Sequence, residues 1–383
     1  MNFDLTNEQR DIKKAARDFA VGEFTDVARD YDLNETFPIE IIDKARKLGF
    51  IGLFIPEKYG GPGFGFLEQA LVLEEFWRVD PGISQQLCSV TFGAEEFLLY
   101  GTEEQKMKYL PPLFEGDSIM GFAITEPDAG SDTAAATTRA VKEGNEYVIN
   151  GNKVMIGNGT KGTFMLVYCL TNPEEKVKTS RHSIIIVETD RKGYDSDRME
   201  GKMGLRCSDT SNIYFSDVRV PQENLLGKEG NGFIQLMNFF DRSRAYVAGH
   251  GVGLAQGALD MGIKQARERR QFGQPLGAFQ ATQFKIAEMA TKVETARNMV
   301  YKAAWLLDQG KPDSKLTAMA KMYACHVAVE VVDEALQLHG GYGYFNDNDI
   351  ERFYRAAKVL EIYEGTKEVE KIVIAREILG KLK

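Results

Sequence analysis

A carboxylate followed by glycine interrupts the helical pattern near the C-terminal end of the sequence. In the run EIYEGTKEVEKIVIAREIL, one apolar helix pattern ends at Tyr363, Glu364 and Gly365 break it, and a second amphipathic pattern starts at Thr366. A Glu at such an apolar joint is either a solvated corner or a base whose pKa is tuned by its surroundings. Gly365 lets the chain turn, and Thr366 is suited to cap the second helix. The residue types alone leave both roles of Glu364 open.

Three further clusters could contact an anionic or aromatic ligand. The stretch TEPDAGSD, residues 125–132, concentrates hydroxyls and backbone N–H groups after an apolar run. This suits contacts to a flavin ring or a pyrophosphate, with an ordinary Asx/Gly turn as the alternative. The arginines of QARERRQFGQPLG could bind phosphates at a helix end or form a solvated face. The glycines of QLHGGYGY permit close backbone approach.

Other motifs argue against a nicotinamide or metal enzyme. The glycines of HGVGLAQG imitate a dinucleotide fingerprint, but the segment before them does not read as a strand, so close helix packing explains them better. The four histidines lack a metal-ligand pattern, and the four cysteines are too far apart for a CxxC pair. We therefore expect no metal site. A reduced, cytoplasmic protein is the simplest interpretation of the cysteines.

The elements that must position these clusters fall into three segments. Residues 1–118 are mostly helical in pattern, residues 119–226 contain short β-rich runs bounded by turn residues, and residues 227–383 return to the helical period. Apolar residues from Ile286 to Leu307 recur in steps of three and four, which predicts a long helix packed in a bundle. The segment around residues 86–99 is expected to be helical as well.

Composition limits the partners. The net charge of −9 argues against nucleic acid as the main partner, because phosphate neutralisation needs clustered basic residues. No run of about 18 apolar residues suggests a membrane span, and the polar N-terminus lacks the apolar stretch of a signal peptide. A local basic site for an anionic ligand remains compatible with this charge.

Taken together and in order, several motifs resemble the acyl-CoA dehydrogenase family over nearly the whole length. They include LGFIGLFIPEKYGG, AITEPDAGSDTAA, ERRQFGQPLGAFQ, LHGGYGY and IYEGTKEV. The resemblance implies a multidomain α+β fold, with a helical N-terminal domain, a middle β-barrel and a C-terminal four-helix bundle. It also implies a homotetramer with FAD at subunit interfaces, an acyl-CoA substrate, and electron-transfer flavoprotein as the electron acceptor.

By this resemblance Glu364 matches the catalytic base of α,β-dehydrogenation. The base removes the α-proton of an acyl-CoA thioester while a hydride leaves the β-carbon for the flavin. The thioester oxygen would be held by the backbone N–H of the Glu and a flavin hydroxyl, which stabilises the enolate. In some relatives the base lies on the helix carrying FDRSRAYV, where this chain has Ser243. Ser243 cannot serve as that base, which favours Glu364.

The resemblance also assigns binding residues. Those matching cofactor contacts are Phe122, Ile124, Thr125, Ser131, Met155, Gly157, Arg269, Gln271, Phe272, Gln337, Gly341, Thr366 and Glu368. Among them, the 269–272 segment corresponds to an arm that reaches the FAD of a neighbouring subunit. Those matching substrate contacts are Ser131, Thr91, Glu95, Asp241, Arg244, Tyr363 and Gly365.

The sequence departs from the family pattern beside the expected flavin. Where relatives carry an aromatic residue and then a Thr or Ser, this chain has Met155 and Gly157. Because Gly157 has no hydroxyl to donate, we hypothesise a shifted flavin potential or altered protection from oxygen. Ala356 replaces a common Asp, a change for which the sequence offers no physical explanation.

The acyl group is the least defined part of the prediction. Thr91, Glu95 and Glu96 are polar where many relatives are apolar. Either the glutamates face solvent, or the pocket suits a polar, branched or alicyclic acyl group of short or medium length. An acyl-CoA oxidase, an enoyl-CoA reductase and a non-catalytic helical scaffold remain alternative functions.

Overall fold

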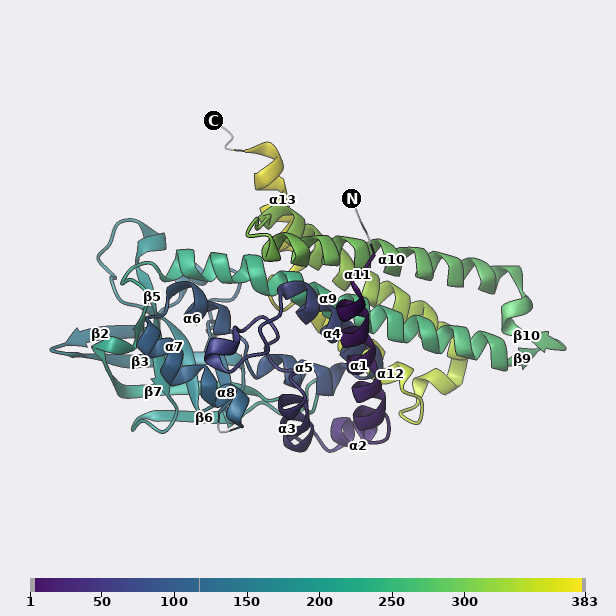
Figure 1. The fold of residues 1–383 in the computed structure, drawn as a ribbon, viewed down its shortest axis with the longest axis horizontal. Coiled ribbons are helices and arrows are strands. Elements are labelled where there is room, and N and C mark those ends of the chain that lie inside the picture. The colour runs from purple at the N-terminus through teal and green to yellow at the C-terminus, as the bar shows by residue number, and fades with distance from the viewer. Residues whose placement is uncertain (1–3, 117, 381–383) are drawn as a thin grey trace.

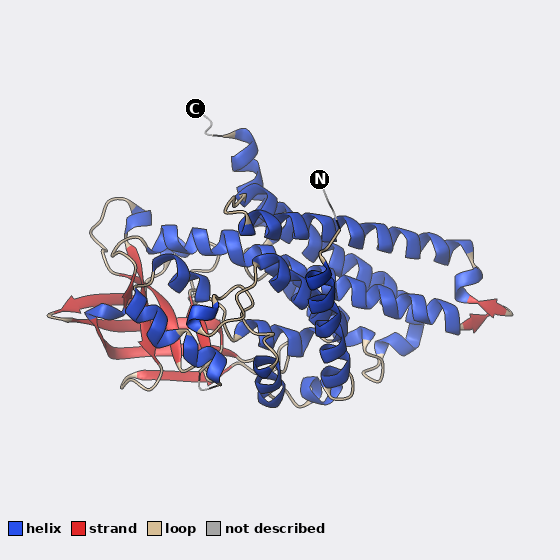
Figure 2. Ribbon diagram, in the orientation of Figure 1, coloured by secondary structure: helices blue, strands red, loops and turns tan. Residues whose placement is uncertain are grey.

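The computed structural model describes residues 4–116 and 118–380, and the chain forms a helical part, a β-sheet part and a second helical part in that order (Figures 1 and 2). This confirms the predicted fold class. The first part contains α1 (Asn7–Phe24), α2 (Ala28–Leu33), α3 (Ile39–Lys47), α4 (Phe66–Val79), α5 (Pro81–Ser89), α6 (Ala94–Tyr100), α7 (Glu103–Tyr109) and α8 (Pro111–Glu115). Single 3-10 turns punctuate the chain at η1 (Glu57–Tyr59), η2 (Thr133–Ala135), η3 (Lys178–Ser180), η4 (Gln222–Asn224), η5 (Leu276–Ala278) and η6 (Gly340–Tyr344).

The expected helix around residues 86–99 is divided in two. α5 ends at Ser89 and α6 begins at Ala94, because Gly93 adopts a left-handed conformation with φ 103°. Such a backbone angle is readily available only to glycine and cannot continue a helix. The break turns α6 toward the long helix of the C-terminal part, which decides where the two glutamates of α6 lie.

The middle part forms one mixed sheet in the order β6-β7-β3-β2-β4-β5-β8, with β1 paired to β4 in parallel. β4 and β5 are buried along almost their whole length, as expected for the apolar runs FMLVYCL and HSIIIVE at the centre of a covered sheet. The strands are β1 (Met120–Ala123), β2 (Arg139–Glu143), β3 (Glu146–Gly157), β4 (Phe164–Leu170), β5 (His182–Glu188), β6 (Tyr194–Arg198), β7 (Thr210–Pro221) and β8 (Leu225–Leu226).

The C-terminal part is built around α9, a helix of 37 residues that reaches from the sheet to the far end of the molecule (Figure 1). Its small residues permit close packing: a Cβ atom on Gly253 would lie 2.4 Å from the carbonyl oxygen of Glu74. The HGVGLAQG glycines therefore pack helices, as predicted. The elements here are α9 (Gly232–Glu268), β9 (Arg270–Gln271), β10 (Gln274–Pro275), α10 (Gln280–Asp308), α11 (Ser314–His339), α12 (Ile350–Leu360) and α13 (Lys367–Leu379).

The predicted apolar stripe of α10 is confirmed, since Met289, Val293 and Val300 are buried and Ile286 is partly buried against the same core. Across residues 4–116 and 118–380, no helix is both long and apolar enough to cross a bilayer.

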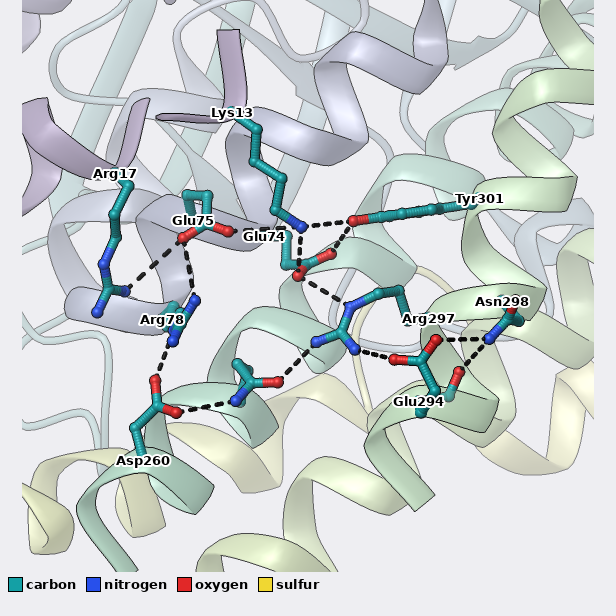
Figure 3. A network of polar contacts seen from close by, with 11 residues as sticks. Lys13, Arg17, Glu74, Glu75, Arg78, Asp260, Glu294, Arg297, Asn298 and Tyr301 are labelled. Carbon is teal, nitrogen blue, oxygen red and sulfur yellow. Dashed lines mark hydrogen bonds and ion pairs between the residues drawn. The ribbon is translucent and has the colours of Figure 1, made fainter. Parts of the chain in front are cut away.

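A buried polar network joins the first helix to the C-terminal part (Figure 3). Glu74 on α4 accepts hydrogen bonds from Lys13 on α1 at 2.9 Å, from Arg297 at 3.1 Å and from Tyr301 on α10 at 2.6 Å. Burial alone would raise its pKa, but the two cations hold the pKa of Glu74 below its usual value. A buried carboxylate is tolerated when it is paired and hydrogen-bonded in this way.

Candidate active site

Glu364 lies in the short turn between α12 and α13 and has an unusual backbone. Its φ is 56°, and φ of Gly365 is 99°. A left-handed conformation is costly for a non-glycine residue and concentrates at functional sites. A Cβ atom on Gly365 would lie 2.2 Å from Oε1 of Glu370, so glycine is required there for space as well. Thr366 caps α13 by accepting from the N–H of Val369 at 3.3 Å, which confirms the predicted N-cap.

The Glu364 carboxyl is half-buried and is not a solvated corner. Its Oε2 accepts a hydrogen bond from Oγ of Ser243 on α9 at 2.8 Å. Burial raises the pKa of Glu364, while this hydrogen bond and the charges of Arg244 and Lys321 oppose the rise. A carboxyl whose pKa is raised takes a proton more readily than one in water.

Ser243, which cannot itself act as a base, is thus the hydrogen-bond partner of Glu364, the residue predicted to be the base. Sequence reasoning set Ser243 aside, and no local pattern connects it to Glu364, since 121 residues separate the two. Phe239, one helical turn before Ser243 on α9, has its ring centroid 5.2 Å from that of Phe122 on β1. The sheet and the base are therefore linked through one face of α9.

Arg244 points inward, toward the turn that carries Glu364. Its Nε donates to the carbonyl oxygen of Glu364 at 2.8 Å and lies 3.1 Å from Oε1 of Glu370 on α13. The side chain is only 7% exposed. Asp241, predicted like Arg244 to be a substrate contact, accepts a hydrogen bond from Ser314 at 2.5 Å, and burial raises its pKa. Contact of either residue with CoA stays a prediction.

Tyr363 packs into the protein on the other side of the turn. Its hydroxyl lies 2.8 Å from Nδ1 of His250, and the His250 ring stacks on Trp77 with centroids 4.4 Å apart. Burial lowers the pKa of His250 to about 3, so the imidazole is neutral at physiological pH.

The expectation that the glutamates of α6 face solvent is wrong. Glu95 is 1% exposed and Glu96 is 0% exposed, because the break at Gly93 directs α6 onto α9. Burial raises the pKa of Glu95 to about 7 and that of Glu96 to about 8. Both oxygens of Glu95 are closed off from solvent, and the charge of Glu364 contributes to its raised pKa. Thr91 is also buried, at 4% exposure. Contact of Thr91 or Glu95 with an acyl group stays a prediction.

Five of the residues predicted beside the flavin ring gather near the C-terminal ends of β1 and β3, a region called the sheet edge below: Phe122, Ile124, Thr125, Met155 and Gly157. The carbonyl of Thr125 accepts from the N–H of Val154, which places the 122–125 segment next to the strand carrying Met155 and Gly157. Met155 has φ 58° and is 65% exposed. Around Gly157, a Cβ atom would meet nothing within 4 Å. Ser131 lies in an exposed loop.

Behind this edge, two buried residues that the sequence prediction missed hold the segment in place. Nζ of Lys153 donates to the carbonyl of Ile124 at 2.8 Å and to Oε1 of Glu126 at 2.9 Å. The sequence offered only a weak signal, a Lys next to the apolar residues Val154 and Met155 in the predicted strand run EYVINGNKVMIG.

A second group of predicted cofactor residues lies at the opposite end of α9, at or near a cavity of about 670 Å³. Arg269, Gln271 and Gly341 line it, and the Arg269 guanidinium lies 5.7 Å from the centroid of the Tyr342 ring. Phe272, which follows Gln271 in the chain, is 93% exposed. Gln337 is exposed on α11. A Cβ atom on Gly340 or Gly341 would meet nothing within 4 Å. An open glycine surface beside a guanidinium fits the pyrophosphate and adenine portions of a dinucleotide.

Thr366 and Glu368, the last two predicted cofactor contacts, lie at the start of α13 next to Glu364, with Glu368 exposed. The structure therefore separates the predicted residues into a group around Glu364 and the sheet edge, and a second group at the far end of α9.

Comparison with known proteins identifies the scaffold. The chain matches the models of the acyl-CoA dehydrogenase N-terminal domain over residues 6–117, middle domain over residues 121–218 and C-terminal domain over residues 230–379. It is 43% identical to an acryloyl-CoA reductase (NADH) of Anaerotignum propionicum, over 99% of this chain and 96% of that protein.

Two solved structures are similar over the full length. Butyryl-CoA dehydrogenase from Megasphaera elsdenii has a TM-score of 0.95 and 38% identity, over 99% of this chain and 100% of that one. A chain in the structure described as the electron transferring flavoprotein of Acidaminococcus fermentans has a TM-score of 0.96 and 42% identity, over 100% of both chains. The protein belongs to the acyl-CoA dehydrogenase family of FAD-dependent oxidoreductases.

Proposed function

We propose that the protein catalyses α,β-dehydrogenation of an acyl-CoA thioester to the 2-enoyl-CoA, with Glu364 as the base. The observation that carries this proposal is the half-buried Glu364 carboxyl in a left-handed turn, held by Ser243 and with a raised pKa. The carboxylate removes the α-proton, and burial raises its affinity for that proton.

The backbone of the same residue has a second role. Among the described residues, no acceptor is bonded to the N–H of Glu364, so this donor is available to the thioester oxygen as negative charge develops on it. When bound, FAD supplies the acceptor for the hydride that leaves the β-carbon. Ser243 holds the carboxyl toward α9, and the adjoining Phe239 and Phe122 rings provide the apolar surface between base and sheet edge.

The acyl group we propose is short or medium in length, branched or alicyclic. Burial of Glu95 close to Glu364 supports a pocket of limited depth, because its polar group occupies space that an extended chain would need. Thr91 and Glu96 are buried as well. The name of the acryloyl-CoA reductase relative supports enoyl-CoA reduction as the second candidate, since the same residues serve the reverse reaction.

We also propose that the active protein is a homotetramer that passes electrons to electron-transfer flavoprotein in the cytoplasm. Arg244 and Arg269 are separated by 25 residues along α9 and its end, which corresponds to about 38 Å at the rise of an α-helix. This separation supports cofactors of two different subunits, one at the cavity beside Arg269 and one at the turn of Glu364. The likeness to the Acidaminococcus structure supports the electron acceptor, and the four unpaired cysteines support the location.

The test is the visible absorption of the purified protein, recorded anaerobically with a panel of acyl-CoA thioesters from straight to branched and alicyclic. We expect a flavin spectrum that at least one thioester bleaches. A flavin spectrum that no saturated thioester bleaches, but that an enoyl-CoA restores after chemical reduction, would favour the reductase. Oxygen consumption with substrate would indicate an oxidase, and absence of flavin after FAD is added would leave only a non-catalytic scaffold.

A further inference from the structure

Two buried cations hold the backbone of the turn that carries Glu364. Lys321 on α11 is 0% exposed, and its Nζ donates to the carbonyl oxygens of Tyr363 at 2.8 Å and Gly365 at 2.5 Å. Nε of Arg244 donates to the carbonyl between them, that of Glu364, at 2.8 Å. Three successive carbonyls thus accept hydrogen bonds from positively charged groups, while the N–H of Glu364 is bonded to no described residue.

One of these contacts acts directly on the N–H of Glu364. The carbonyl of Tyr363 and the N–H of Glu364 belong to the same planar trans peptide, so they point in opposite directions. A contact that fixes the carbonyl therefore fixes the direction of the N–H. A hydrogen bond accepted by the carbonyl also polarises the peptide, which makes its N–H a stronger donor. An ammonium group does this more strongly than a neutral donor.

The neighbouring charges show that Lys321 binds the backbone carbonyls of the turn and does not merely neutralise a nearby carboxylate. Among the described residues, Lys321 donates hydrogen bonds to carbonyls and not to a carboxylate, although Glu370 and Glu364 are near. Glu370 on α13 pairs with Arg244 instead. From α6 and α5, Glu95 and Cys88 also face the base, and burial raises the pKa of each. Burying an ammonium is costly, so its placement on two carbonyls needs a compensating interaction.

We propose that Lys321 is a positioning residue that orients and polarises the N–H of Glu364 as the donor to the thioester oxygen. Its ammonium acts through the Tyr363–Glu364 peptide and does not touch the substrate. This inference rests on the proposed function, because it concerns the stabilisation of the enolate that Glu364 forms. On this proposal, the ammonium of Lys321, which lies outside the acyl pocket, contributes to lowering the barrier to enolate formation.

The test is the acidity of a bound β-ketoacyl-CoA, whose α-proton lies between two carbonyls and whose enolate mimics the reaction intermediate. Acetoacetyl-CoA is bound to the FAD-loaded protein, and enolate absorbance is titrated against pH for wild type, Lys321→Met and Lys321→Arg. We expect Lys321→Met to raise the apparent pKa of the bound ligand by about one unit, a tenfold loss of enolate stabilisation. Lys321→Arg, which keeps the charge, should recover most of the shift.

Lys302→Met, on the exposed face of α10, is the matched control and should titrate as wild type. A purely structural lysine would lower the melting temperature in Lys321→Met but leave the ligand pKa unchanged, and that result would overturn the inference.

If Lys321→Met does not fold, Lys321→Gln is used instead, because its side chain keeps hydrogen-bond donors without the charge. A ligand pKa in Lys321→Gln equal to that of wild type would also overturn the inference. Wild-type protein that binds acetoacetyl-CoA without lowering its pKa would overturn both the inference and the proposed function. A wild-type shift that is retained in Lys321→Met would overturn the inference alone.

Discussion

The sheet edge and the catalytic turn each contain a buried lysine bonded to a backbone carbonyl, but their carboxyl groups behave differently. At the sheet edge, Glu126 accepts from Lys153 at 2.9 Å, from the N–H of Thr137 at 2.6 Å and from the N–H of Thr138 at 2.9 Å. Burial alone would raise its pKa, yet the charge of Lys153 and these hydrogen bonds lower the pKa of Glu126 to about 2. Glu126 is therefore charged at neutral pH.

At the catalytic turn the carboxyls are less well satisfied. Burial raises the pKa of Glu370 to about 7 although Arg244 and Lys321 oppose it, and burial also raises the pKa of Glu364. The number of hydrogen bonds to the charged form decides which group keeps its charge and which can exchange a proton. The comparison distinguishes a carboxylate that is charged at neutral pH from carboxyls of raised pKa, which the proposed proton transfer requires.

The largest expected effect is the loss of the proton acceptor itself. Glu364→Gln should lower kcat by about 10³-fold or more, since general base catalysis contributes about 10²–10⁴-fold. The flavin spectrum should be retained, because Gln can still accept from Ser243. Stopped-flow bleaching by a saturated thioester measures the change, with Glu377→Gln on the exposed face of α13 as the control. Unchanged bleaching would remove Glu364 from the role of base.

Removing the buried ion pair between Glu126 and Lys153 should lower the stability of the fold more than it lowers the reaction rate. Glu126→Leu leaves the ammonium of Lys153 buried without its carboxylate, and such losses typically cost about 3–5 kcal/mol. We expect a lower melting temperature and weaker flavin retention, measured by differential scanning fluorimetry with and without added FAD. Glu143→Leu removes a surface pair with Arg219 and should change stability by less than about 1 kcal/mol. Equal effects of the two variants would contradict the distinction.

The two regions should also respond oppositely to pH. The pKa of Glu126 is depressed in the folded state, so its stabilisation is present at neutral pH and is lost as pH falls from about 4.5 toward 2. The pKa of Glu370 is raised to about 7, so the folded state binds the extra proton and loses stability as pH rises from about 4.5 through 7. Glu370→Gln should therefore flatten the fall in melting temperature between pH 5 and pH 8. A fall as steep as that of wild type would show that Glu370 does not titrate in this range.

The smallest structural effect is expected at Gly157. Because a Cβ atom there would meet nothing within 4 Å, Gly157→Thr should change stability by less than about 0.5 kcal/mol. If the missing hydroxyl sets the flavin environment, the variant should differ from wild type in reduction potential and in its rate of reoxidation by oxygen. Spectroelectrochemistry and oxygen uptake measure the two quantities, and identical values would refute the hypothesis.

Local patterns in the sequence were sufficient for the turn but not for its partners. The Glu364–Gly365–Thr366 order predicts a carboxylate, a tight turn and an N-cap because each property belongs to neighbouring residues. Ser243 lies 121 positions before its partner Glu364, and Lys321 lies 42 positions before its partner Tyr363. Hydrophobic periodicity along the sequence does not indicate contacts over such distances. A Lys on the buried stripe of α11 was the one available sign.

The glutamates of α6 were misplaced for a related reason. Charged residues are mostly exposed, so a solvent-facing position was the better guess from type alone. The break at Gly93 reverses that outcome by turning α6 onto α9, and a break of this kind depends on one backbone angle. The distance between Arg269 and the predicted cofactor residues near Glu364 could not be obtained from the sequence either. It depends on the length of α9, which lies between them.

The network around Glu74 has a consequence for how the chain folds during its synthesis. Lys13 and Tyr301, both hydrogen-bonded at this carboxylate, are 288 residues apart. At about 5–20 residues per second, a nascent chain must wait on the order of tens of seconds after α4 emerges before α10 can join it. Until then Glu74 and its apolar neighbours lack their cover. The N-terminal helices are therefore expected to lack this packing until α10 has been synthesised.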